Sequence, residues 1–356
     1  MEIKYLLAFG IALVLTLLVM PRFIPFLHKI KFGQSMRLEG PKSHMVKTGT
    51  PTMGGIVFVL IPILVLLLLD YQAFSSVEML IVVLAYLGYA LIGFIDDFLI
   101  VVKKNNDGLK PSMKFLLQSV LAVIFYFIYT SVAETTIQIP VLGISLELGI
   151  LYFVLIFFMF TAESNAVNLT DGLDGLCAGT AFIAIAPFVI FALLQDYSDL
   201  AMLLLAVSGS LLGYLRFNIH PAKIFMGDTG SLALGGLLAA SAMILKQELL
   251  LIVIGGVFVI ELLSVVIQVT YYKRTHTKEM LVHGFWLRCP GRLCGQVEAL
   301  AKGFQPRGES VSYTHLAGAS SFFWRSCHSI RSLTLISSMV ISRPAAWLTA
   351  AVIMDR

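Results

Sequence analysis

Nine long apolar runs limit what this chain can fold into more than any other feature of its sequence. A helix that crosses the hydrocarbon core of a bilayer needs about 20 mostly apolar residues, and these runs have about 15 to 23. One soluble core could not bury so much apolar surface, since 58% of the residues are apolar and only 13% are charged. The runs lie at 5–20, 54–69, 79–95, 115–130, 148–162, 176–194, 200–215, 231–245 and 249–271.

The fold class that these runs predict is all-α, a polytopic helical membrane protein. A disordered chain is excluded, because disorder needs low hydrophobicity and high net charge. An outer-membrane β-barrel is disfavoured, because strands of alternating polarity are absent from the sequence. We therefore expect nine recognisable transmembrane helices, one for each apolar run.

The segments between the runs predict the orientation in the membrane. Alternate segments carry 15 Lys and Arg residues, whereas the opposite side has only Lys4 and Lys246. Loops rich in Lys and Arg stay on the cytoplasmic side of a membrane protein. We therefore expect the N-terminus outside and five segments in the cytoplasm, one of them without Lys or Arg. These segments lie at 21–53, 96–114, 163–175, 216–230 and 272–283.

Composition changes near residue 280. Residues 1–283 contain 17 Lys and Arg against 18 Asp and Glu, whereas residues 284–356 contain 8 against 3. All three Trp and three of the four Cys also follow residue 283. The sequence thus predicts a multi-span domain at 1–280 and an atypical tail at 281–356. Because the basic excess belongs to the tail, we expect no nucleic-acid partner.

The predicted cytoplasmic segments hold four polar clusters. The first runs from Lys47 to Gly55 and places a Lys and hydroxyl groups, including that of Thr52, before a glycine pair that opens a helix. Unpaired N–H groups at the start of a helix favour an anionic ligand. A capped helix entry with close glycine packing is the alternative interpretation.

The second cluster is a pair of adjacent acids, Asp96 and Asp97, at the inner end of the third run. Adjacent carboxylates repel each other unless a cation or a proton intervenes. Such a pair can hold Mg²⁺, which commonly joins carboxylates to substrate phosphates. Alternatively, one acid can take a proton from a nucleophile. A solvated helix end is the structural alternative, although acids at a helix C-terminus oppose the helix dipole.

The third cluster, at 165–176, is a loop without Lys or Arg. Asp171 and Asp174 are three residues apart, so one helical turn could place them on one face. Asn168 adds an amide that could bind a base or a sugar. Acids beside anionic lipid headgroups favour a bound cation, whereas an Asx-turn that caps the next helix is the alternative.

The fourth cluster, at 218–231, combines several kinds of functional group before a helix. Asp228 could ligate a metal ion, Lys223 could neutralise a phosphate and Phe225 could stack on a base. The alternative is a capped helix with Asp228 or Thr229 at its start.

Together the four clusters offer at least five carboxylates and several basic groups, with no Ser-His-Asp or Cys-His arrangement. Such a set suits the Mg²⁺-assisted transfer of a phosphoryl-type group at a membrane surface. A secondary transporter is the alternative from another class. Transporters usually place their charged residues near the bilayer midplane, whereas these acids lie at the inner ends of spans.

Several long motifs in order carry a resemblance to a known family. Over about residues 1–280 the chain closely resembles the polyprenyl-phosphate N-acetylhexosamine-1-phosphate transferases. Within that family it is most similar to the muramoyl-pentapeptide branch. The motifs are GTPTMGG (49–55), IDD (95–97), NLTDGLDGL (168–176) and PAKIFMGDTGSLALGG (221–236).

The resemblance implies ten spans in the inner membrane of a bacterium, a cytoplasmic active site and Mg²⁺ as cofactor. It implies the transfer of phospho-N-acetylmuramoyl-pentapeptide from UDP-MurNAc-pentapeptide to undecaprenyl phosphate. UMP is released, and the product, lipid I, enters peptidoglycan synthesis. A homodimer is implied as well.

The family's functional residues map onto matching positions. Asp228 and Asp96 are the predicted metal ligands, and Asp96, Asp97 and Asp228 the predicted catalytic residues. The resemblance implies that Asp96 is the candidate base for the lipid phosphate and that Phe225 stacks under the uracil. The residues that resemble the nucleotide pocket are Lys47, Thr52, Asn168, Asp171, Gly172, Leu173, Asp174 and Phe225.

The resemblance stops after Arg274. The family has a His-His-His-Phe-Glu motif and a tenth span there, and this chain has neither. We hypothesise that residues 281–356 are out-of-frame or chimeric sequence, with a divergent but genuine cytoplasmic tail as the alternative. Two other functions therefore remain open: a sister transferase that uses UDP-GlcNAc, and an inactive product of the aberrant tail.

Overall fold

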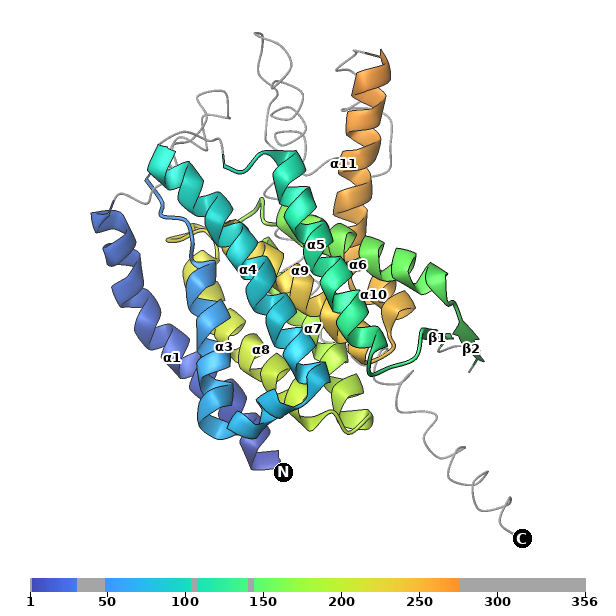
Figure 1. Cartoon of the computed structure of the whole chain (residues 1–356). Coiled ribbons are helices and arrows are strands. Elements are labelled where there is room, and N and C mark those ends of the chain that lie inside the picture. Colours follow the sequence, from blue (N-terminus) through green and yellow to red (C-terminus); the bar gives the residue numbers. More distant parts are fainter. Residues whose placement is uncertain (1, 31–48, 104–107, 140–143, 276–356) are drawn as a thin grey trace, which may run out of the picture. The chain divides into compact units, whose positions relative to one another are not determined.

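The computed structural model describes residues 2–30, 49–103, 108–139 and 144–275 (Figure 1). Lys47 and the predicted tail lie outside the described residues, so the predicted domain division stays a prediction. The described part is almost entirely helical. Its elements are α1 (Glu2–Lys29), α3 (Gly55–Leu69), η1 (Tyr71–Ser75), α4 (Val77–Lys103), α5 (Pro111–Thr130), β1 (Thr136–Ile139), β2 (Ile144–Glu147), α6 (Ile150–Thr170), α7 (Leu176–Leu194), α8 (Ser198–Asn218), α9 (Gly227–Ile244), α10 (Glu248–Ile254) and α11 (Gly256–Thr275).

Each of the nine apolar runs coincides with a helix, and the last coincides with a broken one. The run at 249–271 falls on α10 and α11, which meet at Gly255 with a bend of 81°. Several helices continue past the apolar part into polar residues, so that Asp96 and Asn168 are helical. The structure confirms the prediction of a polytopic helical membrane protein.

Length and composition by themselves mark fewer spans than nine. Among the described residues, six helices are long and apolar enough to cross a membrane, and the bent pair of α10 and α11 would make a seventh. The helix α3 is too short for this test, with 15 residues. The helix α9 is rich in Gly, Ala and Ser, which lowers its hydropathy. Both nevertheless coincide with predicted runs.

The helix α9 lies at the centre of the helix bundle, packed against α3, α4, α6, α7 and α10. Every residue of α9 after Asp228 is buried. Its small residues allow this close packing: a Cβ atom at Gly235 would collide with Ser164 of α6, and one at Gly236 would lie 2.9 Å from the Tyr89 ring of α4. Small residues let helix backbones approach closely in membranes. Because α9 contacts protein rather than lipid, it needs little hydropathy.

A β-hairpin between α5 and α6 is the feature that the sequence analysis does not predict. Its strands β1 and β2 are antiparallel. Lys246, which follows α9, donates hydrogen bonds to the carbonyl oxygens of Glu134 and Thr136, at 2.6 and 2.9 Å. The same ammonium lies 4.9 and 5.0 Å from the ring centres of Tyr129 and Tyr152. These contacts hold the hairpin against the turn after α9. Burial of the ammonium group lowers the pKa of Lys246.

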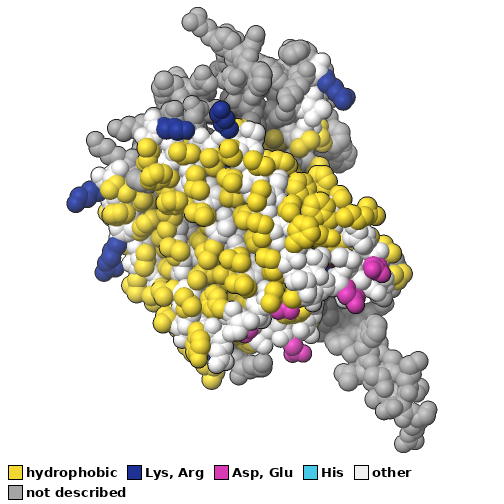
Figure 2. All heavy atoms as spheres, in the orientation of Figure 1, with side chains coloured by type: hydrophobic (Ala, Val, Ile, Leu, Met, Phe, Trp, Pro, Cys, Tyr) yellow, Lys and Arg dark blue, Asp and Glu magenta, His cyan; other side chains and the backbone are white. Residues whose placement is uncertain are grey.

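Large apolar side chains cover the outside of the bundle. Figure 2 shows them over α3, α4 and α5, with Lys and Arg side chains towards one end and Asp and Glu side chains towards the other. A soluble protein rarely exposes so extended an apolar surface, whereas a lipid-facing surface requires it. The exposed apolar residues of α3 and α4 include Leu60, Leu64, Leu67, Leu80, Leu84 and Leu91.

Candidate functional site

The ends of four helices bring three of the predicted acids, Asp96, Asp97 and Asp228, together. Asp228 is the second residue of α9, and Asp96 and Asp97 lie in the last two turns of α4. Lys114 lies in the first turn of α5, and Asn168 in the last turn of α6. We refer to Asp96, Asp97, Asp228, Lys114 and Asn168 as the acidic cluster.

Asp228 is held through both of its carboxylate oxygens. Oδ1 accepts a hydrogen bond of 2.8 Å from Asn168 Nδ2, and Oδ2 forms an ion pair with Lys114 Nζ. Asn168 Nδ2 also donates to Ser231 Oγ, at 2.8 Å. The side chains of Asp228 and Lys114 keep 25% and 15% of their exposure, so a ligand can reach this ion pair from one side.

Asp96 approaches the same ion pair from α4. Its Oδ1 accepts a hydrogen bond of 2.8 Å from the backbone N–H of Leu109. Its carboxyl group lies close enough to Asp228 for the two charges to repel each other, and close enough to Lys114 for attraction. Two carboxyl groups this close need a proton or a cation between them. Lys114 supplies one positive charge for three carboxylates, which leaves the acidic cluster with an excess of negative charge.

Asp97 points to the start of α9 instead. Its Oδ1 accepts a hydrogen bond from Asp228 N at 3.1 Å, and its Oδ2 accepts two from Thr229, at 2.9 Å from N and 2.7 Å from Oγ1. The first N–H groups of a helix have no partner within the helix. Asp97 satisfies two of them from a neighbouring helix, and only 2% of the residue is exposed.

The glycine-rich motif at 49–55 forms a short backbone ladder with residues 225–226. The ladder holds the backbone of Phe225 through both its N–H and its carbonyl oxygen, and the ring of Phe225 stays half-buried. The motif therefore positions the segment that leads into α9. The hydrogen bonds run from Phe225 N to Pro51 O at 2.8 Å, from Gly54 N to Phe225 O at 2.9 Å and from Gly55 N to Met226 O at 2.9 Å.

Close packing explains the glycines of this motif. A Cβ atom at Gly55 would collide with the backbone of Gly230 in α9. Thr52 is 1% exposed, and its Oγ1 lies 3.0 Å from the position of a Cβ atom at Gly227. The structure thus places Thr52 against the start of α9, behind the acidic cluster.

The loop between α6 and α7 holds the segment that precedes α9. Asp174 Oδ2 accepts a hydrogen bond from Ala222 N at 3.2 Å and lies 3.0 Å from His220 Nδ1. Asn218 Oδ1 accepts from Gly175 N at 3.0 Å, and Asn218 Nδ2 donates to the carbonyl oxygen of Ile224 at 2.9 Å. These contacts fix the two loops to each other.

The other predicted nucleotide-pocket residues lie in these two loops. Asp171, Gly172 and Leu173 are half-buried in the turn between α6 and α7, and Lys223 is exposed. The structure thus brings four predicted residues together at the start of α9, whereas Asp171, Gly172, Leu173, Asp174 and Lys223 lie in adjoining loops. Lys47 lies outside the described residues. The four residues at the start of α9 are Asp96, Asp97, Asn168 and Asp228.

Lys114 is the functional residue that the sequence reasoning missed. The sequence analysis uses it only as one positive charge of the segment at 96–114. Lys114 is the fourth residue of α5, which contains no acid that could indicate an ion pair. Its partner, Asp228, follows 114 residues later in the sequence. Its position immediately before an apolar run was the one available signal.

The carboxylates of the acidic cluster suit a magnesium ion that takes its remaining ligands from a substrate. Among the described residues, no group of three or more His, Cys, Asp or Glu side chains is arranged to hold a metal ion by itself. Mg²⁺ usually binds through one or two carboxylates together with waters and substrate phosphates. Asp228 and Asp96 supply two carboxyl groups close enough to repel each other, which fits that chemistry.

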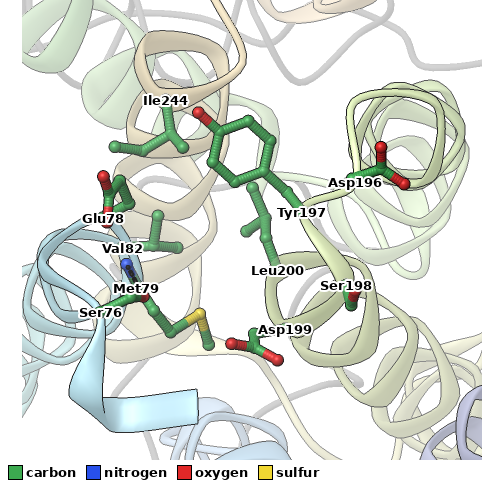
Figure 3. A pocket seen from close by; sticks show the side chains of 10 residues that line it. All are labelled: Ser76, Glu78, Met79, Val82, Asp196, Tyr197, Ser198, Asp199, Leu200 and Ile244. Carbon is green, nitrogen blue, oxygen red and sulfur yellow. Dashed lines mark hydrogen bonds between the residues drawn. The ribbon is translucent and has the colours of Figure 1, made fainter. Parts of the chain in front are cut away.

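A cavity of about 240 Å³ lies at the other end of the bundle, away from the acidic cluster. Figure 3 shows its side chains, which come from the start of α4, the turn before α8 and the end of α9. Glu78, in its lining, is 18 residues before Asp96 on the same helix, which is about 27 Å at 1.5 Å per residue. Its lining residues are Ser76, Glu78, Met79, Val82, Asp196, Tyr197, Ser198, Asp199, Leu200 and Ile244.

Comparison with known proteins agrees with this arrangement. Residues 79–246 match the model of glycosyl transferase family 4. The chain is 51% identical over 278 residues to the phospho-N-acetylmuramoyl-pentapeptide-transferase of Geobacillus sp. (strain WCH70), an alignment that covers 77% of this chain and 86% of that protein. It is 53% identical over 269 residues to those of Bacillus mycoides (strain KBAB4) and Bacillus anthracis, which covers 75% of this chain and 83% of each of theirs.

The chain belongs to the phospho-N-acetylmuramoyl-pentapeptide-transferase family. The resemblance predicted from the four motifs is thereby confirmed. The family match spans α4 to α9, and so contains every member of the acidic cluster. Together with the apolar helices, membership shows a multi-pass membrane protein of bacterial type that acts as a phospho-sugar transferase.

Proposed function

We propose that the chain transfers phospho-N-acetylmuramoyl-pentapeptide from UDP-MurNAc-pentapeptide to undecaprenyl phosphate, and so forms lipid I for peptidoglycan synthesis. An oxygen of the lipid phosphate attacks the phosphorus that carries the sugar. The bond from that phosphorus to the UMP oxygen breaks, and UMP leaves. The ion pair of Asp228 and Lys114, beside Asp96 at the joined ends of three helices, carries this proposal.

The barrier to this reaction lies in bringing two anions together, since the lipid phosphate is already a nucleophile. Lys114 is the cation that the structure places in the cluster, and Lys223 lies exposed in the loop before α9. Both can lower the repulsion between the two phosphate groups. Mg²⁺, when bound, supplies further positive charge and polarises the phosphoryl oxygens.

We assign roles to the chain's own groups on this basis. Asp228 and Asp96 would hold the metal ion, and Asp96 would take a proton that the lipid phosphate still carries. Asn168 keeps Asp228 oriented through its hydrogen bond, and Phe225 stacks under the uracil. The remaining proposed nucleotide contacts are Lys47, Asp171, Gly172, Leu173 and Asp174, whereas the buried Thr52 packs against the start of α9.

The proposed location is the inner membrane of a bacterial cell, with the N-terminus outside and the acidic cluster facing the cytoplasm. The last turns of α1, α4 and α8 carry Lys29, Lys103 and Arg216. These helices end on the side where the acidic cluster lies, as the positive-inside rule requires of a cytoplasmic face. A homodimer is also part of this proposal and rests on the family alone.

UMP release by the purified full chain in detergent tests the function. Undecaprenyl phosphate is supplied with either UDP-MurNAc-pentapeptide or UDP-GlcNAc, with and without Mg²⁺. We expect UMP only with the pentapeptide substrate and only with Mg²⁺, and none from the Asp228→Asn variant. Asp196→Asn, an exposed acid at the far end of the bundle, is the matched control.

Two outcomes contradict the proposal. UMP release with UDP-GlcNAc alone would move the chain to the sister transferases. No release with either donor, from protein that melts cooperatively, would show that this chain does not perform the reaction. UMP release in the absence of Mg²⁺ would support the proposed reaction but contradict the proposed role of Mg²⁺.

A further inference from the structure

The two adjacent acids of the IDD motif make different contacts. Asp96 faces Lys114 and Asp228 and accepts one backbone hydrogen bond, from Leu109. Asp97 accepts three hydrogen bonds, all from the first residues of α9. A carboxylate has about four lone-pair sites, so Asp97 has little capacity left for a further partner.

We propose that Asp97 is a positioning residue, which caps α9 from α4 and thereby sets the position of Asp228. The reactive carboxylates are then Asp96 and Asp228 alone. This inference rests on the proposed function, because the residue that Asp97 positions is the proposed metal ligand. It assigns different roles to Asp96 and Asp97, which the sequence motif presents as equivalent.

The contacts on Asp97 leave no room for a substrate. Only 2% of the residue is exposed. Gly227 covers Oδ2 so closely that a Cβ atom there would lie 2.6 Å from that oxygen. Thr229 contacts the same oxygen through both its N–H and its hydroxyl group. A nucleophile or a leaving group could reach Asp97 only after the start of α9 had moved.

The same contacts connect Asp97 directly to Asp228. The N–H that binds Asp97 Oδ1 belongs to Asp228 itself, so the carboxylate of one residue fixes the backbone of the other. One helical turn before Asp97, Gly93 packs against the carbonyl group of Asp228, where a Cβ atom would collide with it. Groups that orient a metal ligand typically change metal affinity by about 10- to 100-fold when they are altered.

The test compares Asp97→Asn with Asp96→Asn in the full-length protein. Asn keeps the size of Asp and one acceptor oxygen, but its NH₂ group opposes one of the donors of α9. Thr229→Val is a second variant, since it removes only the hydroxyl donor to Asp97. Asp196→Asn serves again as the control with the same change of charge.

Three measurements are made on each variant. Hydrogen exchange of the amides of Asp228 and Thr229 reports on the cap. Electron paramagnetic resonance of Mn²⁺, titrated in the presence of UMP, reports metal binding without turnover. UMP release at increasing Mg²⁺ gives the maximal rate and the Mg²⁺ midpoint separately.

We expect Asp97→Asn to speed exchange at the two amides, to weaken Mn²⁺ binding about 10-fold and to raise the Mg²⁺ midpoint by a similar factor. High Mg²⁺ should restore most of its rate. Thr229→Val should shift both midpoints in the same direction, by about threefold, because one hydrogen bond is lost. Asp96→Asn should leave the exchange of the two amides unchanged and lose rate at every Mg²⁺ concentration.

The proposal is overturned if Asp97→Asn keeps wild-type exchange and Mn²⁺ binding but loses as much maximal rate as Asp96→Asn, since Asp97 would then act on the substrate. Wild-type protein that binds no Mn²⁺ with UMP would overturn it as well. If the wild type binds Mn²⁺ and Asp97→Asn weakens that binding, yet no UMP is released, the positioning role stands and the proposed reaction fails.

Discussion

The acidic cluster and the cavity at the far end of the bundle each contain three acids, but only the acidic cluster fixes its carboxylates through an ion pair and hydrogen bonds from several helices. Asp96, Asp97 and Asp228 receive hydrogen bonds from α6, α9 and the segment before α5, and they share Lys114. The acids of the far cavity are Glu78, Asp196 and Asp199, which lie in turns and first helical turns and stay partly or fully exposed.

The difference shows that the number of acids does not define a site. At the far cavity, solvent reaches the carboxylates and weakens their interactions, although Asp199 still interacts with Asp70 and Lys4. At the acidic cluster the carboxylates are fixed in contact, so their repulsion persists until a cation relieves it. Four variants test this contrast, in order of decreasing effect.

Asp228→Asn should show the largest effect. The variant removes a carboxylate that is held in place by Asn168 and Lys114, and we expect the rate of UMP release to fall about 1000-fold. Asp196→Asn at the far end should change the rate less than about twofold, because it is exposed and lies in a turn that Asn tolerates at φ 61°. If both variants lowered the rate of UMP release equally, the contrast between the two ends would be wrong.

Lys114→Met should lower the rate of UMP release by about 100-fold, since it removes the positive charge in contact with Asp228. The variant also leaves three carboxylates without their partner, so the protein should bind Mn²⁺ more readily in the absence of substrate. A Mn²⁺ titration followed by electron paramagnetic resonance checks this second effect. Lys4→Met, which breaks the exposed ion pair with Asp70, is the matched control.

Gly93→Ala should lower the stability by about 2 kcal/mol, because the added methyl group collides with the Asp228 carbonyl group. The measurement is the midpoint of thermal unfolding in detergent. Gly179→Ala is its control, since a Cβ atom there meets nothing within 4 Å and Ala favours a helix. An unchanged midpoint in Gly93→Ala would show that α4 and α9 are not held as closely as the structure places them.

Asp174→Asn should have the smallest effect of the four. Asn keeps one acceptor oxygen for Ala222 N but loses the charge that faces His220. We expect the KM for the UDP substrate to rise about fivefold while kcat changes little, because this contact positions a loop beside the cluster. Steady-state UMP release at saturating lipid measures both constants. A loss in kcat with an unchanged KM would contradict this role.

Much of the fold could be predicted from hydrophobicity alone. The nine apolar runs coincide with helices because apolar length is a local property of the chain. The hairpin of β1 and β2 could not be predicted in this way, since its strands have four residues each and depend on Lys246 from a distant turn. Nor could the break at Gly255, which lies within a continuous apolar run.

Part of the site could also be predicted from local features of the sequence. Asp96, Asn168 and Asp228 stand out as polar residues at the ends of apolar runs, and the motifs that carry the family resemblance contain them. Lys114 belongs to none of these motifs, and its partner is 114 residues away. The sequence motif also presents Asp96 and Asp97 as a pair, although one faces the cluster and the other caps α9.

The sequence by itself determined that this chain spans a membrane, which family it resembles and which acids belong to its motifs, because composition and motif order are read along the chain. Only the tertiary structure decided which groups share a contact. Adjacent residues on a helix point about 100° apart, so Asp96 and Asp97 meet different neighbours. Ion pairs such as that of Lys114 with Asp228 exist only where packing brings separate helix ends together.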